Sequence, residues 1–80
     1  MYYVYLLKSL VNLKKTYIGM TDNVQIRLEM HNEGRCPFTS RYRPWELVAF
    51  VAVKSKAHAV ELERYFKSGS GHAFAHKHLW

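Results

Sequence analysis

Several features are scarce or missing in this sequence. It contains one cysteine, Cys36, so an internal disulfide is impossible, as is usual for a protein of a reducing compartment. No charged-then-apolar leader opens the chain, and no apolar run approaches the roughly 18 residues of a membrane-spanning helix. We therefore expect a cytoplasmic protein with no membrane segment.

The motifs of several enzyme classes are missing too. The chain has no internal repeat, no low-complexity linker, no phosphate-binding glycine loop and no serine or cysteine nucleophile motif. Its 80 residues are enough for a single domain, residues 1–80, with a small core. Because 49% of the residues are hydrophobic, we expect this domain to fold rather than to remain disordered.

Acidic residues are few: the sequence contains six, against twelve lysines and arginines, which gives a formal net charge of +6. Glu63 is the last of them, and residues 35–43 contain three arginines and no acid. A charge distribution of this sign favours an anionic partner, most simply nucleic acid. The alternative is a small basic protein whose charge serves only solubility.

Two aromatic and β-branched runs open the chain, at residues 2–7 and 16–20, with a polar stretch between them. Runs of this composition joined by a short polar link predict an antiparallel hairpin. Tyr5 lies on one face of the first strand, and Tyr17 and Gly19 share one face of the second. Whether the two tyrosines meet depends on the register of the hairpin, which the pattern leaves open.

A helix is predicted to follow, from the capping cluster at residues 21–23 to about residue 32 or 33, with Gly34 just beyond its end. Arg27 and His31 fall in the middle of its apolar arc, one turn apart. Polar groups there indicate a cleft between this helix and the hairpin. The alternative is that Arg27 extends to solvent and His31 is a satisfied, half-buried residue. The arc that we expect to face solvent contains Gln25, Glu29, Asn32 and Glu33, and the apolar arc contains Val24, Ile26, Leu28 and Met30.

Residues 35–44 contain two prolines and are predicted to form a loop. Cations and a ring alternate in Arg41-Tyr42-Arg43, as they do on surfaces that contact phosphates and bases, although an ordinary solvated loop would look the same. Residues 45–54 are apolar on both alternating faces, which predicts a strand covered on both sides. With the hairpin, this strand makes a three-stranded sheet.

A second helix is predicted over residues 56–67, capped by Ser55, with Ala59, Leu62 and Phe66 as its inward stripe. Glu63 continues that stripe, whereas Glu61 points away. An inward carboxylate serves either as an ion-pair partner, for example of Arg27, or as a metal ligand, and spacing alone does not choose.

Residues 69–80 are predicted to form a small basic and aromatic tail. We expect Phe74, Leu79 and Trp80 to pack onto the core. The histidines of this tail lack the cysteine pair or acid of a full transition-metal site, so a packed or phosphate-contacting tail is favoured.

Together, Tyr3-Val4-Tyr5, Tyr17-Ile18-Gly19, Arg27-x-x-x-His31-Asn32 and the helical Glu63 followed by Lys67 resemble the GIY-YIG nuclease superfamily over essentially the whole chain. The resemblance is strongest to small stand-alone bacterial members similar to the amino-terminal domain of excinuclease C. It implies an α+β fold of the sandwich-like kind, a small three-stranded antiparallel sheet flanked by helices. It also implies hydrolysis of DNA phosphodiester bonds, branched or damaged DNA included, with one divalent metal ion, Mg²⁺ or Mn²⁺.

The resemblance also implies roles for single residues. Glu63 would hold the metal, Tyr5 and Tyr17 would hold and activate the attacking water with Tyr5 as the base, and Arg27 would stabilise the phosphate charge. His31 would orient or assist the base, and Gly19 would allow close backbone packing at the site. For tyrosine to act as a base near neutral pH, a nearby cation must favour its phenolate. The residues that we expect to contact nucleic acid are Arg35, Arg41, Arg43, Lys67 and Lys77.

Two positions depart from the family pattern. The first tripeptide begins with Tyr3 where glycine is usual, and no asparagine follows Asn32, although many members carry one after the metal glutamate. The second departure puts catalytic strength in doubt more than the fold. A non-catalytic nucleic-acid-binding domain on the same scaffold therefore stays as an alternative function, and a protein-interaction module with an aromatic tail is a third.

Overall fold

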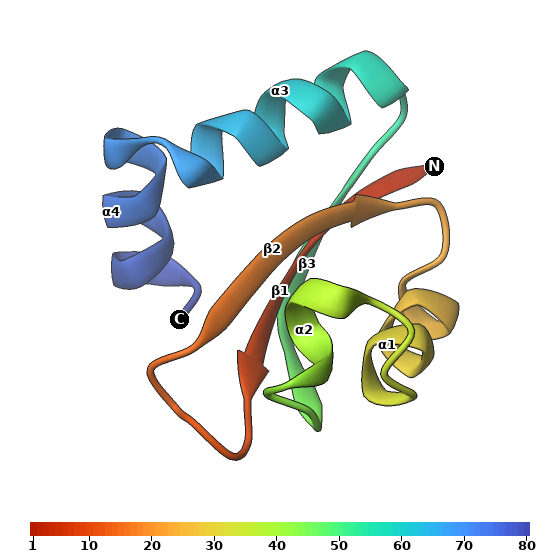
Figure 1. Cartoon of the computed structure of the whole chain (residues 1–80). Coiled ribbons are helices and arrows are strands. Elements are labelled where there is room, and N and C mark those ends of the chain that lie inside the picture. Colours follow the sequence, from red (N-terminus) through yellow and green to blue (C-terminus); the bar gives the residue numbers. More distant parts are fainter.

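A computed structural model describes residues 1–80, and its three strands form one antiparallel sheet in the order β2-β1-β3. Helices α1 and α2 lie on one face of the sheet, and α3 and α4 on the other (Figure 1). The predicted α+β class with a three-stranded antiparallel sheet is confirmed. None of the helices has the length and apolar character that a membrane crossing requires. The elements are β1 (Tyr2–Ser9), β2 (Thr16–Thr21), α1 (Val24–Asn32), α2 (Pro37–Ser40), β3 (Trp45–Val53), α3 (Lys56–Lys67) and α4 (Gly69–His78).

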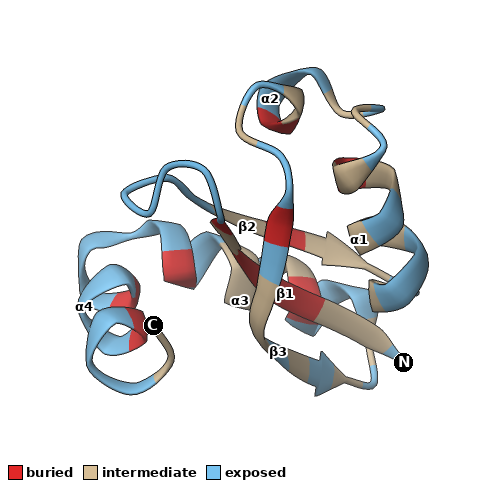
Figure 2. Ribbon diagram, turned by 90° about the horizontal axis from the view of Figure 1, so that it is seen from below, coloured by how far each residue is buried: buried red, intermediate tan, exposed pale blue.

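Strand β1 is the centre of the sheet and its most buried element (Figure 2). Because successive side chains of a strand point to opposite faces, Val4 and Leu6 face α3 and α4, and Tyr5 and Leu7 face α1 and α2. The sheet therefore separates two small cores. The first contains Val4, Leu6, Ala59, Phe66 and Ala75, and the second contains Tyr5, Leu7 and Trp45.

The prediction that the strand over residues 45–54 is covered on both faces is wrong. β3 pairs only with β1 and is an edge strand, and Phe50 is 50% exposed. Its ring contacts that of Tyr3 edge to face, with 5.6 Å between centroids, beside an open hollow at the start of α1. The helices on this face stop short of Phe50, so an apolar residue stays at the surface.

The predicted ends of the first two helices are confirmed. The Asn23 side chain caps α1 by accepting a hydrogen bond of 3.0 Å from the Ile26 backbone N–H. Gly34 follows the last turn with φ of +81°, a left-handed conformation that glycine adopts without strain. Ser55 caps α3 in the same way as Asn23 caps α1, by accepting from the His58 N–H at 3.1 Å.

Two side chains of α1 lie elsewhere than its helical pattern predicts. Ile26, expected on the inner arc, is 53% exposed. Asn32, expected to face solvent, is partly buried and joins α1 to the first residue of β3. Its amide nitrogen donates to the Trp45 carbonyl at 3.1 Å, and its amide oxygen accepts from the Trp45 N–H. The backbone N–H and C=O of Trp45 lie at the start of an edge strand and require hydrogen-bond partners. Asn32 supplies both, so it is turned toward β3 and away from solvent.

Two regions contain more helix than predicted. Within the expected loop at residues 35–44, Pro37 begins the short helix α2, a position that suits proline because its fixed φ is helical. Residues 69–78 form α4 instead of an irregular tail, and Ser68 caps that helix by accepting from the Gly71 N–H. A Cβ at Gly71 would collide with the Tyr65 carbonyl, so glycine is required where α4 turns back against α3.

The packing predicted for the last residues is confirmed only in part. Leu79 and Trp80 pack against the core beneath α3 and α4, as expected. Phe74 lies at the edge of this core: its ring contacts that of Phe66, with 6.4 Å between centroids, but 44% of the residue is exposed.

Candidate active site

The register of the hairpin brings the two predicted tyrosines together. Tyr5 pairs with Gly19 and Leu7 pairs with Tyr17, and side chains of directly paired residues share a face. Tyr5 and Tyr17 therefore lie diagonally on the α1 face of the sheet, with 6.2 Å between their ring centroids. The sequence pattern left open whether the two tyrosines meet, and the observed register shows that they do.

Gly19 makes room for both rings. A Cβ at this position would lie 2.5 Å from the Tyr5 hydroxyl oxygen and 2.9 Å from Cε2 of Tyr17, closer than packed atoms approach. The backbone of β2 is thus the surface against which the Tyr5 hydroxyl and the Tyr17 ring rest, and a side chain at position 19 would displace them.

His31 is fully buried, and both of its ring nitrogens have partners. Nε2 lies 2.9 Å from the Tyr5 hydroxyl, and Nδ1 lies 2.7 Å from the hydroxyl of Thr39. Its ring also contacts Tyr17, with 5.0 Å between centroids. Burial lowers the pKa of His31, and the nearby Arg27 guanidinium lowers it further, so the imidazole is held neutral.

The hydrogen bonds around His31 are compatible with the tautomer protonated at Nδ1. In that tautomer Nδ1 donates to the Thr39 hydroxyl at 2.7 Å, and that hydroxyl has the Cys36 carbonyl at 3.3 Å as its own acceptor. Nε2 is then a free acceptor, and the Tyr5 hydroxyl donates to it. This arrangement makes His31 a ready acceptor for the Tyr5 proton.

Arg27 comes from the same helix as His31 and lies beside Tyr5. Its Nε is the one buried side-chain nitrogen or oxygen in the structure without a hydrogen-bond partner. Such a group is costly to bury unpaired, so its retention beside Tyr5 points to a role of the Arg27 guanidinium at this site. The Tyr5 hydroxyl raises the pKa of Arg27, so the guanidinium stays charged.

Tyr5 is not held as a phenolate. Burial raises its pKa to about 12, and the opposing effect of Arg27, which favours the phenolate, is smaller. Tyr5 is also only 1% exposed, whereas Tyr17 is partly exposed. The expectation that cations of this cleft favour a Tyr5 phenolate does not hold for the protein's own side chains.

Thr39 belongs to this site but has no signal in the sequence. It is 1% exposed and links three segments: its hydroxyl contacts His31, and its carbonyl accepts from Nε1 of Trp45 at 2.8 Å. The short helix α2, which was predicted as a loop, places it there. Only the proline at the start of that helix hinted that residues 37–40 are ordered.

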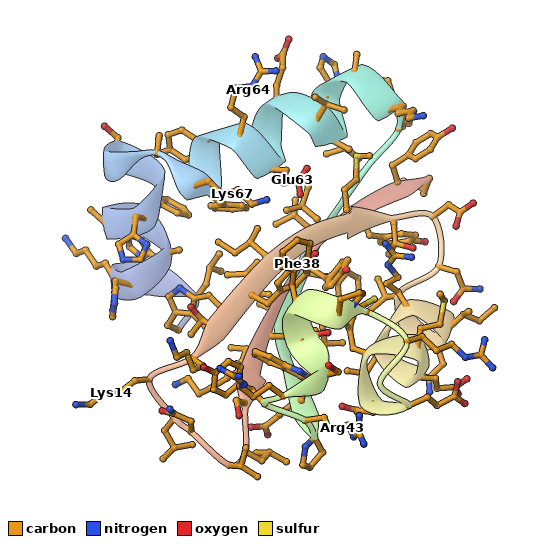
Figure 3. All side chains as sticks on the ribbon, in the orientation of Figure 1. Lys14, Phe38, Arg43, Glu63, Arg64 and Lys67 are labelled. Atoms are coloured by element: carbon orange, nitrogen blue, oxygen red, sulfur yellow. The ribbon has the colours of Figure 1, made fainter.

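Glu63 approaches the site from the other side of β2. It and Lys67 project from α3 toward β2, whereas Arg64 points away (Figure 3). The ion pair considered between Glu63 and Arg27 is absent, because the Glu63 carboxylate pairs with Lys67 Nζ at 3.2 Å. Lys67, the ion-pair partner of Glu63, also lines an open pocket of about 330 Å³ together with Tyr17.

The donor set at Glu63 limits which metal it could hold. No cluster of three or more histidine, cysteine, aspartate or glutamate side chains is present in the chain. A single, partly exposed carboxylate fits Mg²⁺ or Mn²⁺, which keep several waters and bind through one or two carboxylates and substrate phosphates. Such an ion would have to displace the ammonium group of Lys67 from the Glu63 carboxylate, or share that carboxylate with it.

The basic residues predicted to contact nucleic acid are all exposed, but their surroundings differ. Arg35 already pairs with Glu33 at 2.9 Å. Tyr42, expected between two arginines on a contact surface, packs instead in the core on the α1 face. The exposed ring of this segment is Phe38, at 88% exposure, next to Thr39. The other predicted contacts are Arg41, Arg43, Lys67 and Lys77.

Comparisons with known proteins place the chain among nucleases. Over 57 residues, the chain is 46% identical to the structure-specific endonuclease subunit SLX1 of Podospora anserina, and the match covers 65% of this chain and 16% of that protein. Identity is 43% over 56 residues to the same protein of Debaryomyces hansenii and 41% over 54 residues to its homolog in Giardia intestinalis. The match thus spans only 15 to 16% of the length of these relatives.

The sequence profile of the GIY-YIG catalytic domain matches residues 1–75, which include the hairpin tyrosines, Arg27, His31 and Glu63. The chain therefore belongs to the GIY-YIG family and carries its catalytic domain.

Proposed function

We propose that this protein is a divalent-metal-dependent endonuclease that hydrolyses phosphodiester bonds in branched DNA. The observation that carries the proposal is the buried Tyr5–His31 pair on the face of β1 and β2, beside the unsatisfied Nε of Arg27. The names of the fungal relatives, structure-specific endonuclease subunits, support branched DNA as the substrate class. A cytoplasmic location and a likeness to excinuclease C in particular stay predictions.

Phosphodiester hydrolysis needs an activated water and stabilisation of the charge on the phosphate. In our proposal Arg27 supplies part of that stabilisation, because its guanidinium is always charged and its Nε has no other partner. Glu63 would hold the divalent ion, which supplies charge stabilisation to the phosphate and the leaving oxygen when bound.

The protein's own groups supply a route for the proton of the attacking water. Tyr5 is protonated near neutral pH, because its pKa is about 12, so it acts as a relay rather than as a standing phenolate. As the water oxygen bonds to phosphorus, the water proton passes to the Tyr5 oxygen and the Tyr5 proton passes to Nε2 of His31. The P–O bond to the leaving oxygen then breaks. His31 is suited to this role because it is neutral and, in the tautomer protonated at Nδ1, Nε2 accepts from the Tyr5 hydroxyl.

Tyr17 has a different part in this proposal. It is the partly exposed member of the pair and lines the pocket with Lys67, so we place it against the phosphate or its water. Because Tyr5 is almost inaccessible, side chains around its hydroxyl have to move before a water molecule reaches it.

The test uses labelled single-stranded, duplex, flap and four-way DNA, incubated with the protein with and without Mg²⁺. We expect cleavage of branched DNA that requires the ion and is lost in Glu63→Gln. Glu61→Gln is the matched control, because Glu61 lies on the same helix but is exposed. Absence of cleavage of every substrate, or equal activity in the two variants, would contradict the proposal.

A second candidate is a domain that binds nucleic acid without cutting it. It is favoured by the Glu63–Lys67 ion pair, which occupies the metal carboxylate, and by the missing asparagine. In that case salt-dependent binding to DNA survives Glu63→Gln and requires no metal, and no product forms.

A further inference from the structure

The largest hollow of the molecule lies outside the tyrosine–histidine site, where the loop between β1 and β2 faces α4. Its volume is about 390 Å³. Lys14 projects from that loop, on the side of the sheet where α4 lies (Figure 3). Every ionisable side chain of the lining is basic. The lining residues are Lys8, Leu13, Lys14, Thr16, His72, His76 and Trp80.

This hollow continues into the pocket beside Tyr17. The two share Thr16 of β2 and His72 of α4, and the second also contains Lys67. Together they form one surface depression that runs from Tyr17 to Trp80, which we call the α4 groove. One of its ends lies at the candidate active site, and no acidic side chain lines it.

Trp80 gives the groove an aromatic wall. Part of its side chain packs on the core beneath α3 and α4, and part lines the hollow. The lining also includes Leu13, an apolar side chain that is 68% exposed. An indole that lines the same hollow as two lysines combines the two elements of single-strand binding, which are a ring for base stacking and cations for the phosphates.

A hollow with an aromatic wall favours a single strand over a duplex. To stack on Trp80, a base must enter the hollow away from its complement, which a base in a duplex cannot do without being unpaired. To bind the phosphates of a duplex, a flat basic surface is sufficient, and neither a hollow nor an aromatic ring is required.

We propose that the α4 groove binds the unpaired single-stranded arm of a branched DNA, with one base on Trp80 and the arm's phosphates on Lys8 and Lys14. This inference rests on the proposed function, because it places the scissile phosphate at the Tyr17 end. It gives branched DNA a physical basis, since the paired part of the substrate would lie at the active site and the arm along α4.

Binding is measured by fluorescence anisotropy in EDTA, so that cleavage does not interfere, with a labelled duplex and the same duplex carrying a single-stranded arm. We expect the wild type to bind the armed DNA more tightly. Trp80→Ala should weaken armed binding about five-fold or more and leave duplex binding unchanged, and Trp80→Phe should largely restore it. Lys14→Ala should weaken armed binding and lower its salt dependence by about 0.7 in log–log slope.

Lys56→Ala is the matched control, because Lys56 is exposed at the far end of α3 from α4. Circular dichroism checks that each variant is folded. Lys14 lies in an exposed loop and keeps the test decisive if Trp80→Ala does not fold. Equal loss of duplex and armed binding, or unchanged armed binding in folded Trp80→Ala or Lys14→Ala, overturns the proposal. Cleavage is scored separately, so arm binding without cleavage would contradict the nuclease function and leave the groove standing.

Discussion

The Tyr5 hydroxyl and Nε2 of His31 lie 2.9 Å apart in a site that water barely reaches. The two residues are 26 positions apart in the chain, one on the central strand and one on α1, so only the fold brings them together. Burial affects them in complementary ways: it raises the pKa of the tyrosine to about 12 and lowers that of the histidine. Near neutral pH the pair therefore holds one proton donor and one empty acceptor.

The lowered pKa of His31 makes stability depend on pH. The unfolded chain binds a proton at this histidine more readily than the folded protein does, so the free energy of unfolding should fall as pH falls below about 6.5. The loss should level off below the lowered pKa of the folded state. Urea denaturation between about pH 5 and pH 8 measures this effect. His31→Gln should flatten the curve, and His58→Gln, a change at an exposed histidine, should not. Parallel curves for wild type and His31→Gln would exclude the effect.

Gly19→Ala should separate the pair. The added Cβ would meet the Tyr5 hydroxyl at 2.5 Å and push it away from His31. We expect a loss of about 1–3 kcal/mol in the free energy of unfolding, as for other overpacked sites, together with loss of cleavage. Gly69→Ala is the control: a Cβ there meets nothing within 4 Å, and alanine favours a helix, so stability should hold or rise. If Gly19→Ala keeps wild-type stability and cleavage, the close packing is not needed.

Thr39→Val should act on the site through His31. Valine keeps the shape of threonine but leaves Nδ1 of His31 buried without a partner, which costs about 1–3 kcal/mol. The histidine proton is then free to move to Nε2, where it would block transfer from Tyr5. We therefore expect slower cleavage and, by ¹⁵N NMR of the histidine ring, a change in tautomer. Thr39→Ser retains the hydroxyl and should restore both. A tautomer that is the same in Thr39→Val and wild type would show that Thr39 only packs.

The sequence predicted the features of this fold that depend on neighbouring residues. The capping side chains Asn23 and Ser55, the hairpin and the inward stripe of α3 are all local patterns, and the structure confirms them. Arg27 and His31 were noticed for the same reason, because they interrupt an apolar helical arc. The structure brings both residues to the face of the sheet that carries Tyr5, and their roles at the site stay predictions.

What the sequence did not predict depends on contacts between distant segments. Asn32 looked like a solvent residue because its partner, the backbone of Trp45, belongs to another element. Thr39 was not predicted as a site residue because its contribution is a hydrogen-bond contact with His31, which belongs to another helix. The helix at residues 69–78 was missed because its glycines argue against helix, whereas Gly71 is needed for the close turn against α3.

Lys67→Ala should change how the protein binds a metal ion. The Lys67 ammonium lies 3.2 Å from the Glu63 carboxylate, where its charge opposes a divalent cation. Removing it should tighten Mn²⁺ binding, measured by calorimetry or by the spin-resonance signal of free Mn²⁺, without DNA present. Stability should change by only about 0.5 kcal/mol or less, because exposed ion pairs one helical turn apart contribute little. Arg64→Ala, on the outer side of α3, should leave Mn²⁺ binding unchanged, and Glu63→Gln should abolish it. If Lys67→Ala binds Mn²⁺ no better than wild type while Glu63→Gln binds it equally well, Glu63 is not the metal ligand and the ion pair is only structural.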